Sequence, residues 1–168
     1  MDYKNVYVAS VAIGADMKQT VKALQEADTY DGPAIVLAYT PCQQHGYPSN
    51  LGMSKLVDVT KQAVQTGYWP LYRYDPRRAS EGKNPFQLDF KKVKGDLKQY
   101  LATQNRYQTL VRNNPEYAAE LQDHLQKELL ARHEERVRMA MSDKELIKAL
   151  EKNSKSGDKY TLSLCLYL

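Results

Sequence analysis

The chain has 168 residues, of which 42 % are hydrophobic and 26 % are charged, and this length suits one domain with a core of its own. The net charge of +4 has no strongly clustered basic patch behind it, which argues against nucleic acid as a partner. No apolar run approaches membrane-spanning length and the amino terminus carries no apolar signal region, so the sequence predicts neither a membrane protein nor a secreted one.

The first third of the chain is typical of one βαβ unit. Residues 6–13 are apolar on both faces, as a central parallel strand would be. Gly14 makes the turn into a helix predicted over residues 16–30, which Asp31-Gly32-Pro33 ends. The apolar residues of this helix form one stripe: Met17, Val21, Leu24 and Ala27. A second strand over residues 34–39 follows, and its crossover should be right-handed.

The middle of the chain combines a long irregular segment with an aromatic one. Residues 40–52 are predicted to form a loop, after which Ser54 caps a helix that ends near Gln65. Residues 68–74 are extended and aromatic. Because Pro70 cannot donate a hydrogen bond to a central ladder, this segment is predicted to be an edge strand. Its rings could stack on nucleic acid, but core and interface packing is the better interpretation, since few basic residues lie nearby.

From Asp96 onward the pattern is helical. Asn114 and Pro115 mark a new helix start, predicted to continue to about Met141, and Ser142 with Glu145 has the spacing of a capping box. The sequence thus predicts an α/β fold with an incomplete, mostly parallel sheet followed by a helical extension. The predicted divisions are an α/β part over 1–90, helices over 91–153 and a flexible tail over 154–168.

Cys42 is the leading candidate for a functional residue. It follows the second predicted strand, and ligands of open α/β sheets collect beyond the carboxyl ends of the strands. A thiolate there can hold a metal or an iron–sulfur cluster. The alternative is a small buried hydrophobe, the commoner role of a lone cysteine. With Cys165 as the second cysteine, a disulfide framework is excluded and a reduced, cytoplasmic or organelle-matrix location is expected.

Other residues give weaker signals. His45 could be a ligand or could form a nucleophilic pair with Cys42, but a tetrahedral site needs further ligands and no orienting group is evident. His124 and His133 are expected at the surface of a polar helix face. Gly14 could leave backbone N–H groups open to a phosphate, or it could simply make a tight turn.

Four sequence blocks, in order, carry a family resemblance. They are residues 6–14, residues 31–33 with 38–42, residues 67–76 and residues 82–89. The chain resembles the carboxyl-terminal part of pyruvate:ferredoxin (flavodoxin) oxidoreductases, the end of their thiamine-diphosphate domain, over about residues 3 to 140. The most specific strings are Gly67-Tyr68-Trp69-Pro70-Leu71 and Lys83-Asn84-Pro85-Phe86-Gln87-Leu88-Asp89.

The resemblance implies a chemistry for the whole enzyme. Such enzymes convert pyruvate and coenzyme A into acetyl-CoA and CO₂ with thiamine diphosphate and Mg²⁺, and they pass electrons through [4Fe–4S] clusters to ferredoxin or flavodoxin. The resemblance also implies a homodimer, in the cytoplasm or in the matrix of an anaerobic organelle. Cys42 matches the family's last ligand to the cluster nearest the thiamine, so it is the cofactor-binding and metal-ligating residue that the resemblance implies.

Several features of the family have no counterpart in this sequence. The stretch that holds thiamine diphosphate through magnesium has no counterpart here, nor do the other three ligands of that cluster. No catalytic residue is therefore assigned, and the isolated chain is expected to be inactive and to bind no cofactor alone, its partner being the remainder of the oxidoreductase. The alternative is a non-catalytic α/β-helical module that docks on a partner protein, as the incomplete sheet and the 13 tyrosines suggest.

Overall fold

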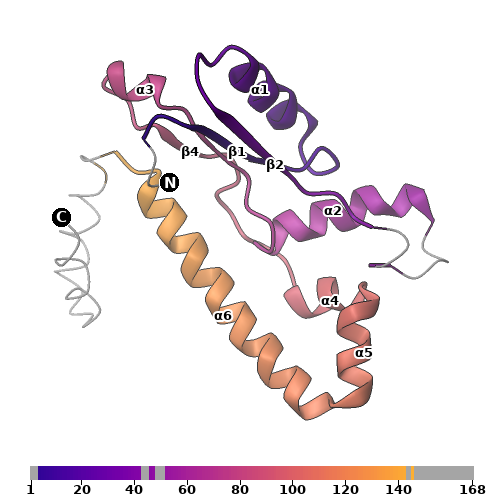
Figure 1. Cartoon of the computed structure of the whole chain (residues 1–168). Coiled ribbons are helices and arrows are strands. Elements are labelled where there is room, and N and C mark those ends of the chain that lie inside the picture. Colours follow the sequence, from indigo (N-terminus) through magenta and orange to yellow (C-terminus); the bar gives the residue numbers. More distant parts are fainter. Residues whose placement is uncertain (1–3, 43–45, 48–51, 143–144, 146–168) are drawn as a thin grey trace, which may run out of the picture.

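A small sheet and a long helix dominate the computed structural model, which describes residues 4–42, 46–47, 52–142 and 145 (Figure 1). The strands are β1 (Tyr7–Val11), β2 (Ala34–Ala38), β3 (Tyr72–Tyr74) and β4 (Phe86–Leu88), in the spatial order β2-β1-β3-β4. Strand β1 is parallel to β2 and antiparallel to β3, which is antiparallel to β4. The α/β fold with an incomplete sheet and a helical extension is confirmed. The described sheet is mixed, with one parallel pair, so parallel pairing does not predominate in it.

The prediction of an edge strand over residues 68–74 was wrong. Only Tyr72–Tyr74 of this segment are in a strand, β3, and β3 lies between β1 and β4. The strand begins after Pro70, so the missing N–H of that proline leaves no gap in the ladder. Instead, the Pro70 carbonyl accepts a hydrogen bond from Ser10 Oγ at 2.6 Å. Strand β4 has only three residues, and no strand was predicted there.

Six helices surround or extend the sheet in the part of the chain that the structure describes. They are α1 (Met17–Asp28), α2 (Leu56–Gln65), α3 (Arg77–Ser80), α4 (Leu97–Ala102), α5 (Asn105–Asn113) and α6 (Pro115–Met139), and a 3₁₀ turn, η2 (Met53–Lys55), precedes α2. Helix α6 begins where α5 ends, and its last residue, Met139, lies next to the segment before β4 (Figure 1). None of these helices is both long and apolar enough to cross a membrane.

The helix starts agree with most of the predicted caps. Asp16 accepts a hydrogen bond from the Gln19 amide at 2.9 Å, and Asn114 accepts one from the Tyr117 amide at 3.2 Å. Ser54 does not cap α2, because it lies inside the 3₁₀ turn that precedes the helix.

One half of the predicted capping box is formed at Ser142. In the predicted capping box, Glu145 Oε2 accepts hydrogen bonds from the Ser142 amide at 2.9 Å and from its hydroxyl at 2.7 Å. The helix predicted to follow, and the tail over 154–168, lie outside the described residues.

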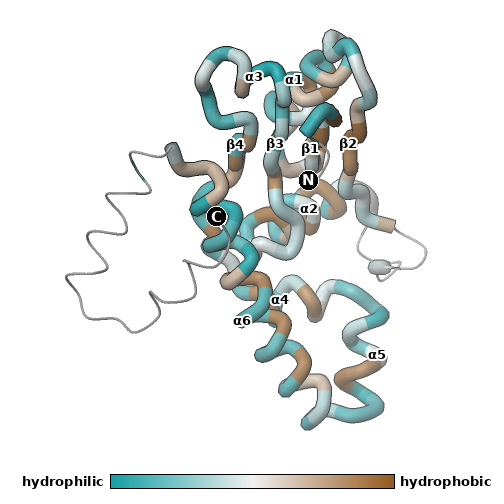
Figure 2. The backbone as a smooth tube through the Cα atoms, turned by 60° about the vertical axis from the view of Figure 1, so that its left-hand side comes forward, coloured by the Kyte–Doolittle hydropathy of each residue, from teal (hydrophilic) through white to brown (hydrophobic). Residues whose placement is uncertain are grey.

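Of the predicted apolar stripe of α1, only Ala27 packs against the core, and the other three residues do not face it. Met17, Val21 and Leu24 are 64 %, 47 % and 51 % exposed, whereas Gln19, Thr20 and Ala23 are buried. Ala23 packs against a buried layer on β1, which consists of Tyr7, Ala9 and Val11. Strand β2, at one edge of the sheet (Figure 2), also exposes Ile35 and Leu37. Both elements therefore present apolar surface that no described residue covers.

A buried arginine joins α1 to the antiparallel half of the sheet. The Arg73 side chain on β3 is only 7 % exposed. Its guanidinium donates to Glu26 Oε1 at 2.6 Å and, through two nitrogens, to the Asp89 carboxylate at 2.8 and 2.9 Å. Gln19 Nε2 donates to the same Asp89 at 2.9 Å, which explains why this glutamine is buried. Buried charges that are paired in this way stabilise a fold only as a complete set.

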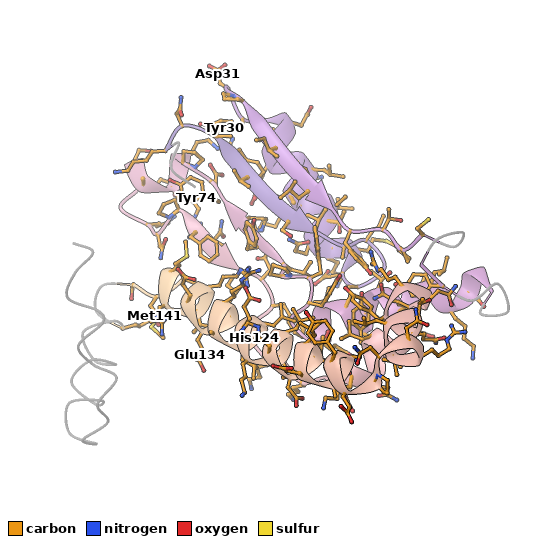
Figure 3. The ribbon with its side chains drawn as sticks, turned by 60° about the horizontal axis from the view of Figure 1, so that its bottom comes forward. Tyr30, Asp31, Tyr74, His124, Glu134 and Met141 are labelled. Atoms are coloured by element: carbon orange, nitrogen blue, oxygen red, sulfur yellow. The ribbon has the colours of Figure 1, made fainter. Side chains whose placement is uncertain are left out.

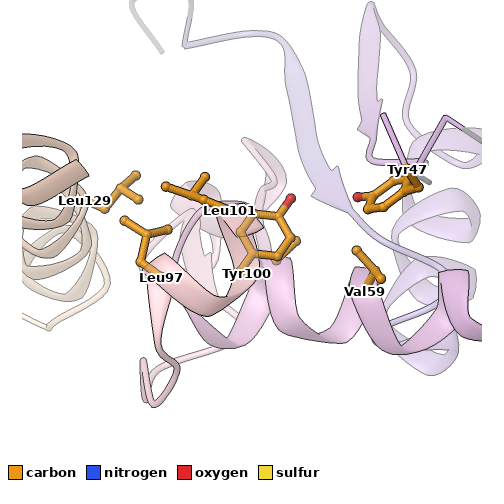
Figure 4. Close-up of a cluster of buried hydrophobic side chains, with 7 residues drawn as sticks. Tyr47, Val59, Leu97, Tyr100, Leu101 and Leu129 are labelled. Atoms are coloured by element: carbon orange, nitrogen blue, oxygen red, sulfur yellow. The ribbon is translucent and has the colours of Figure 1, made fainter. Parts of the chain in front are cut away.

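A second core connects the sheet to the helical extension. Helix α4 contributes Leu97, Tyr100 and Leu101, which lie between Leu129 of α6 on one side and Val59 with Tyr47 on the other (Figure 4). Two rings of the predicted aromatic segment, Tyr68 and Trp69, are partly buried and pack against this cluster. Packing, rather than a stacking surface for nucleic acid, is therefore what these two rings do.

Candidate functional site

Cys42 lies just beyond the carboxyl end of β2, and the described residues 39–42 and 46–47 around it are called the Cys42 turn. The residue is exposed, so it is not the small buried hydrophobe that the sequence left open. Its carbonyl accepts a hydrogen bond from the Gly46 amide at 2.9 Å. A Cβ atom on Gly46 would approach that carbonyl oxygen to 3.0 Å, which is tighter than ordinary packing, so a larger residue there would have to displace the Cys42 carbonyl.

A cleft opens beside this turn, at the carboxyl ends of the parallel strands. Its volume is about 360 Å³. The lining side chains come from the segments after β1 and β2 and from the start of α2: Ile13, Gly14, Tyr39, Thr40, Pro41, Leu56, Val57 and Thr60. No carboxylate or cation is among them, so the cleft offers a mostly apolar wall next to the cysteine. This is the position at which open α/β sheets hold ligands.

Gly14 serves the backbone rather than a phosphate. The amides of Ala15 and Asp16 both donate to the Ala12 carbonyl, at 2.9 and 3.0 Å, so they are already bound within the turn. A Cβ atom on Gly14 would lie 3.1 Å from Thr60, which shows how closely α2 approaches here. The structure thus favours the tight-turn interpretation over the phosphate site.

Tyrosine hydroxyls connect the Cys42 turn to the helical extension. The Tyr39 hydroxyl lies 2.7 Å from that of Tyr100 and 3.2 Å from that of Tyr47. Nearby, the hydroxyls of Tyr68 and Tyr107 lie 3.0 Å apart. Local sequence could not reveal these pairs, because Tyr39 and Tyr100 are 61 positions apart in the chain. The excess of tyrosine over phenylalanine was the only signal that buried hydroxyls would need partners.

Burial favours the protonated form of three of these hydroxyls, those of Tyr47, Tyr100 and Tyr107. It raises the pKa of Tyr107 to about 12, with a contribution from the hydrogen bond to Tyr68. Burial, followed by the hydrogen bond to Tyr39, also raises the pKa of Tyr47 and of Tyr100 well above the ordinary range.

Stability should therefore fall in alkali. Unfolded tyrosine loses its proton near pH 10, whereas folded Tyr107 keeps it until about pH 12, so between these values the unfolded chain releases protons that the folded chain retains. The stabilisation is complete below about pH 10 and is lost as the pH rises through about 12. Urea midpoints measured at successive pH values would show the decline. A midpoint that stays constant over this window would contradict the prediction.

The histidines contribute no site that the structure can assemble. His45 lies outside the described residues, as does Cys165. His124 is exposed on α6 (Figure 3), as expected. His133 is only partly exposed, and its Nε2 lies 3.0 Å from the Lys91 carbonyl, so it ties α6 to the segment after β4. Among the described residues, no three His, Cys, Asp or Glu side chains gather as a metal ion would require.

The fold is that of an α/β protein with a small mixed sheet, and Cys42 lies beyond the carboxyl end of one of its two parallel strands. No family model matches the chain. It is 52 % identical over 132 residues to the mitochondrial pyruvate dehydrogenase (NADP⁺) of Euglena gracilis, a match that covers 79 % of this chain and 7 % of that protein.

Two bacterial relatives agree with this match. Over 140 residues, 83 % of this chain, it is 44 % identical to the pyruvate:ferredoxin oxidoreductase of Moorella thermoacetica and 42 % identical to a probable pyruvate-flavodoxin oxidoreductase of Escherichia coli. The chain belongs to the family of pyruvate:ferredoxin and pyruvate:flavodoxin oxidoreductases. It spans about 12 % of the length of these two relatives, so it corresponds to one section of a much longer enzyme.

Proposed function

We propose that this chain contributes Cys42 as one ligand of a [4Fe–4S] cluster in a pyruvate:ferredoxin (flavodoxin) oxidoreductase. The observation that carries the proposal is an exposed cysteine beyond the carboxyl end of an edge strand, in a chain homologous to such enzymes. Iron–sulfur clusters are held by cysteine thiolates, so the donor atom fits. One cysteine fits one corner of a cluster, and the remaining ligands would come from the rest of the enzyme.

In that setting the bound cofactors carry the chemistry: thiamine diphosphate with Mg²⁺ supports decarboxylation of pyruvate with coenzyme A, and the clusters pass single electrons to ferredoxin or flavodoxin. The residues of this chain would position Cys42 and line the space beside it. The Gly46 turn fixes the backbone that carries Cys42. The apolar side chains of the neighbouring cleft, with Ile13, Pro41 and Leu56, would lie beside the cluster, and burial and solvent exposure are among the factors that set the reduction potential of a cluster.

A docking module is the second candidate function. It is favoured by the exposed apolar residues of α1 and β2 and by the position of β2 at the sheet edge. The two candidates differ in what the chain needs Cys42 for. A module that only docks would bind the remainder of an oxidoreductase equally well with or without the thiol.

The isolated chain should not turn over pyruvate. The sequence has no counterpart of the stretch that, by the family resemblance, holds thiamine diphosphate through magnesium. The test is dye reduction by the purified chain with pyruvate, coenzyme A, thiamine diphosphate and Mg²⁺, without oxygen. The complete Moorella enzyme serves as the positive control. Pyruvate-dependent reduction above the rate without protein would refute the assignment of the chain as one section of the catalytic unit.

A further inference from the structure

The turn that carries Cys42 is attached on both sides to helix α4 and its neighbour α5. Tyr39 lies three residues before Cys42 and Tyr47 five residues after it. The Tyr39 hydroxyl bonds to both Tyr47 and Tyr100, at 3.2 and 2.7 Å. The Gly46 carbonyl also accepts a hydrogen bond from the Asn105 amide at 3.0 Å, at the start of α5. The helical extension therefore contacts the turn at two independent points.

The two tyrosines that hold the turn, Tyr39 and Tyr100, are themselves packed against the sheet and the helical core. Tyr100 is 1 % exposed and packs within the core that joins α4 to α2 and α6, as Figure 4 shows. The Tyr39 ring lies 5.3 Å from the Trp69 ring, and Trp69 Nε1 donates to the Val11 carbonyl of β1 at 3.1 Å. The position of the turn is thus set by both the sheet and the helical extension. Neutral, buried hydroxyls make this attachment, so it does not depend on salt.

We propose that Tyr100 is a positioning residue for Cys42: through the hydroxyls of Tyr39 and Tyr47 it holds both arms of the turn, and so fixes the direction in which the thiol is presented. This inference rests on the proposed function, in which Cys42 is a cluster ligand. It assigns a role to the helical extension, which otherwise lies outside the α/β unit. A ligand held in this way keeps its geometry when the cluster changes charge, whereas a mobile ligand does not.

The first test uses the chain alone and needs no cofactor. Tyr100→Phe keeps the ring and removes one hydroxyl, and amide hydrogen exchange at Gly46 and Asn105 should become roughly two- to tenfold faster, as expected for the loss of one hydrogen bond. The matched control is Tyr107→Phe, which removes the similar bond to Tyr68 but no hydrogen bond to Tyr39 or Tyr47. Unchanged exchange at both amides in Tyr100→Phe would overturn the proposal.

A second variant keeps the proposal testable if Tyr100→Phe perturbs the core. Tyr39→Phe lies at the centre of the three hydroxyls and removes both bonds at once. Exchange of the β1 amides bonded to β2 reports whether the fold is intact. With β1 exchange unchanged, faster exchange at Gly46 supports the proposal, and equal exchange refutes it.

The second test uses the oxidoreductase that contains this section. Tyr100→Phe should retain the iron but shift the reduction potential of the cluster and speed its loss to a chelator, whereas Tyr107→Phe should do neither. If Cys42→Ser leaves the iron content unchanged, the proposed function itself fails. If Cys42→Ser removes the iron while Tyr100→Phe matches the unmodified enzyme in potential and chelation rate, only the positioning role fails.

Discussion

Replacing Cys42 by serine in the assembled oxidoreductase is expected to remove one cluster, about four iron atoms per site, and to abolish pyruvate-dependent electron transfer through it. A serine hydroxyl is a harder and much less acidic ligand than a thiol, so it would not replace the thiolate on iron. The chain offers a matched control in its second cysteine. Cys165→Ser makes the same chemical change at the other cysteine of the chain.

The measurements are iron content and the electron paramagnetic resonance signal of the reduced enzyme. The expected pattern is loss of one cluster signal in Cys42→Ser and full retention in Cys165→Ser. Full iron content in Cys42→Ser would leave the docking function as the better account, especially if the exposed face of α1 and β2 still binds the rest of the enzyme. Loss of iron in both variants would point to general instability of the assembled protein rather than to ligation.

Arg73→Ala is expected to lower the free energy of unfolding by about 3–5 kcal/mol, the usual cost of removing one member of a buried ion-pair set. The change would leave Glu26 and Asp89 as neighbouring carboxylates without their shared cation. Those two residues belong to α1 and to the segment after β4, so the loss would separate elements that are distant in sequence. Urea unfolding of the chain, followed by far-ultraviolet circular dichroism, measures the effect.

The comparison variant is Arg132→Ala, which breaks an exposed ion pair with Glu128 one turn away on α6. Exposed pairs of this kind contribute only about 0.3–0.5 kcal/mol. If Arg73→Ala cost no more than Arg132→Ala, the carboxylates must be reached by water in solution. The cluster around Arg73 would then not be what holds α1 against the sheet.

The sequence predicted those features whose cause lies within a few residues. Asp16 and Asn114 cap helices by bonding to amides three residues ahead, and that information is entirely local. The position of Cys42 at the end of a strand followed from the apolar run before it. In contrast, the place of β3 inside the sheet depended on pairing with β1, more than 60 positions earlier in the chain, which no local pattern encodes.

The same limit explains what was missed at the candidate site. The attachment of the turn to Tyr100, and the burial of Arg73 between two carboxylates, join residues from three or four elements. The stripe of Met17, Val21 and Leu24 was recognised correctly as apolar, but its periodicity could not say which surface covers it. Gln19 is buried in its place, because its side chain reaches Asp89 and the Ser10 carbonyl.

Strand β2 has a hydrogen-bonded neighbour on one side only among the described residues, and its other side presents unpaired backbone groups flanked by Ile35 and Leu37. Such an edge can pair through its backbone with a strand of another chain, and this pairing depends little on the sequence of that strand. During synthesis, correct completion of the sheet would thus compete with pairing of this edge to another incompletely folded copy. The timing of assembly, as much as the contacts within the chain, would decide whether a working enzyme or an insoluble deposit is formed.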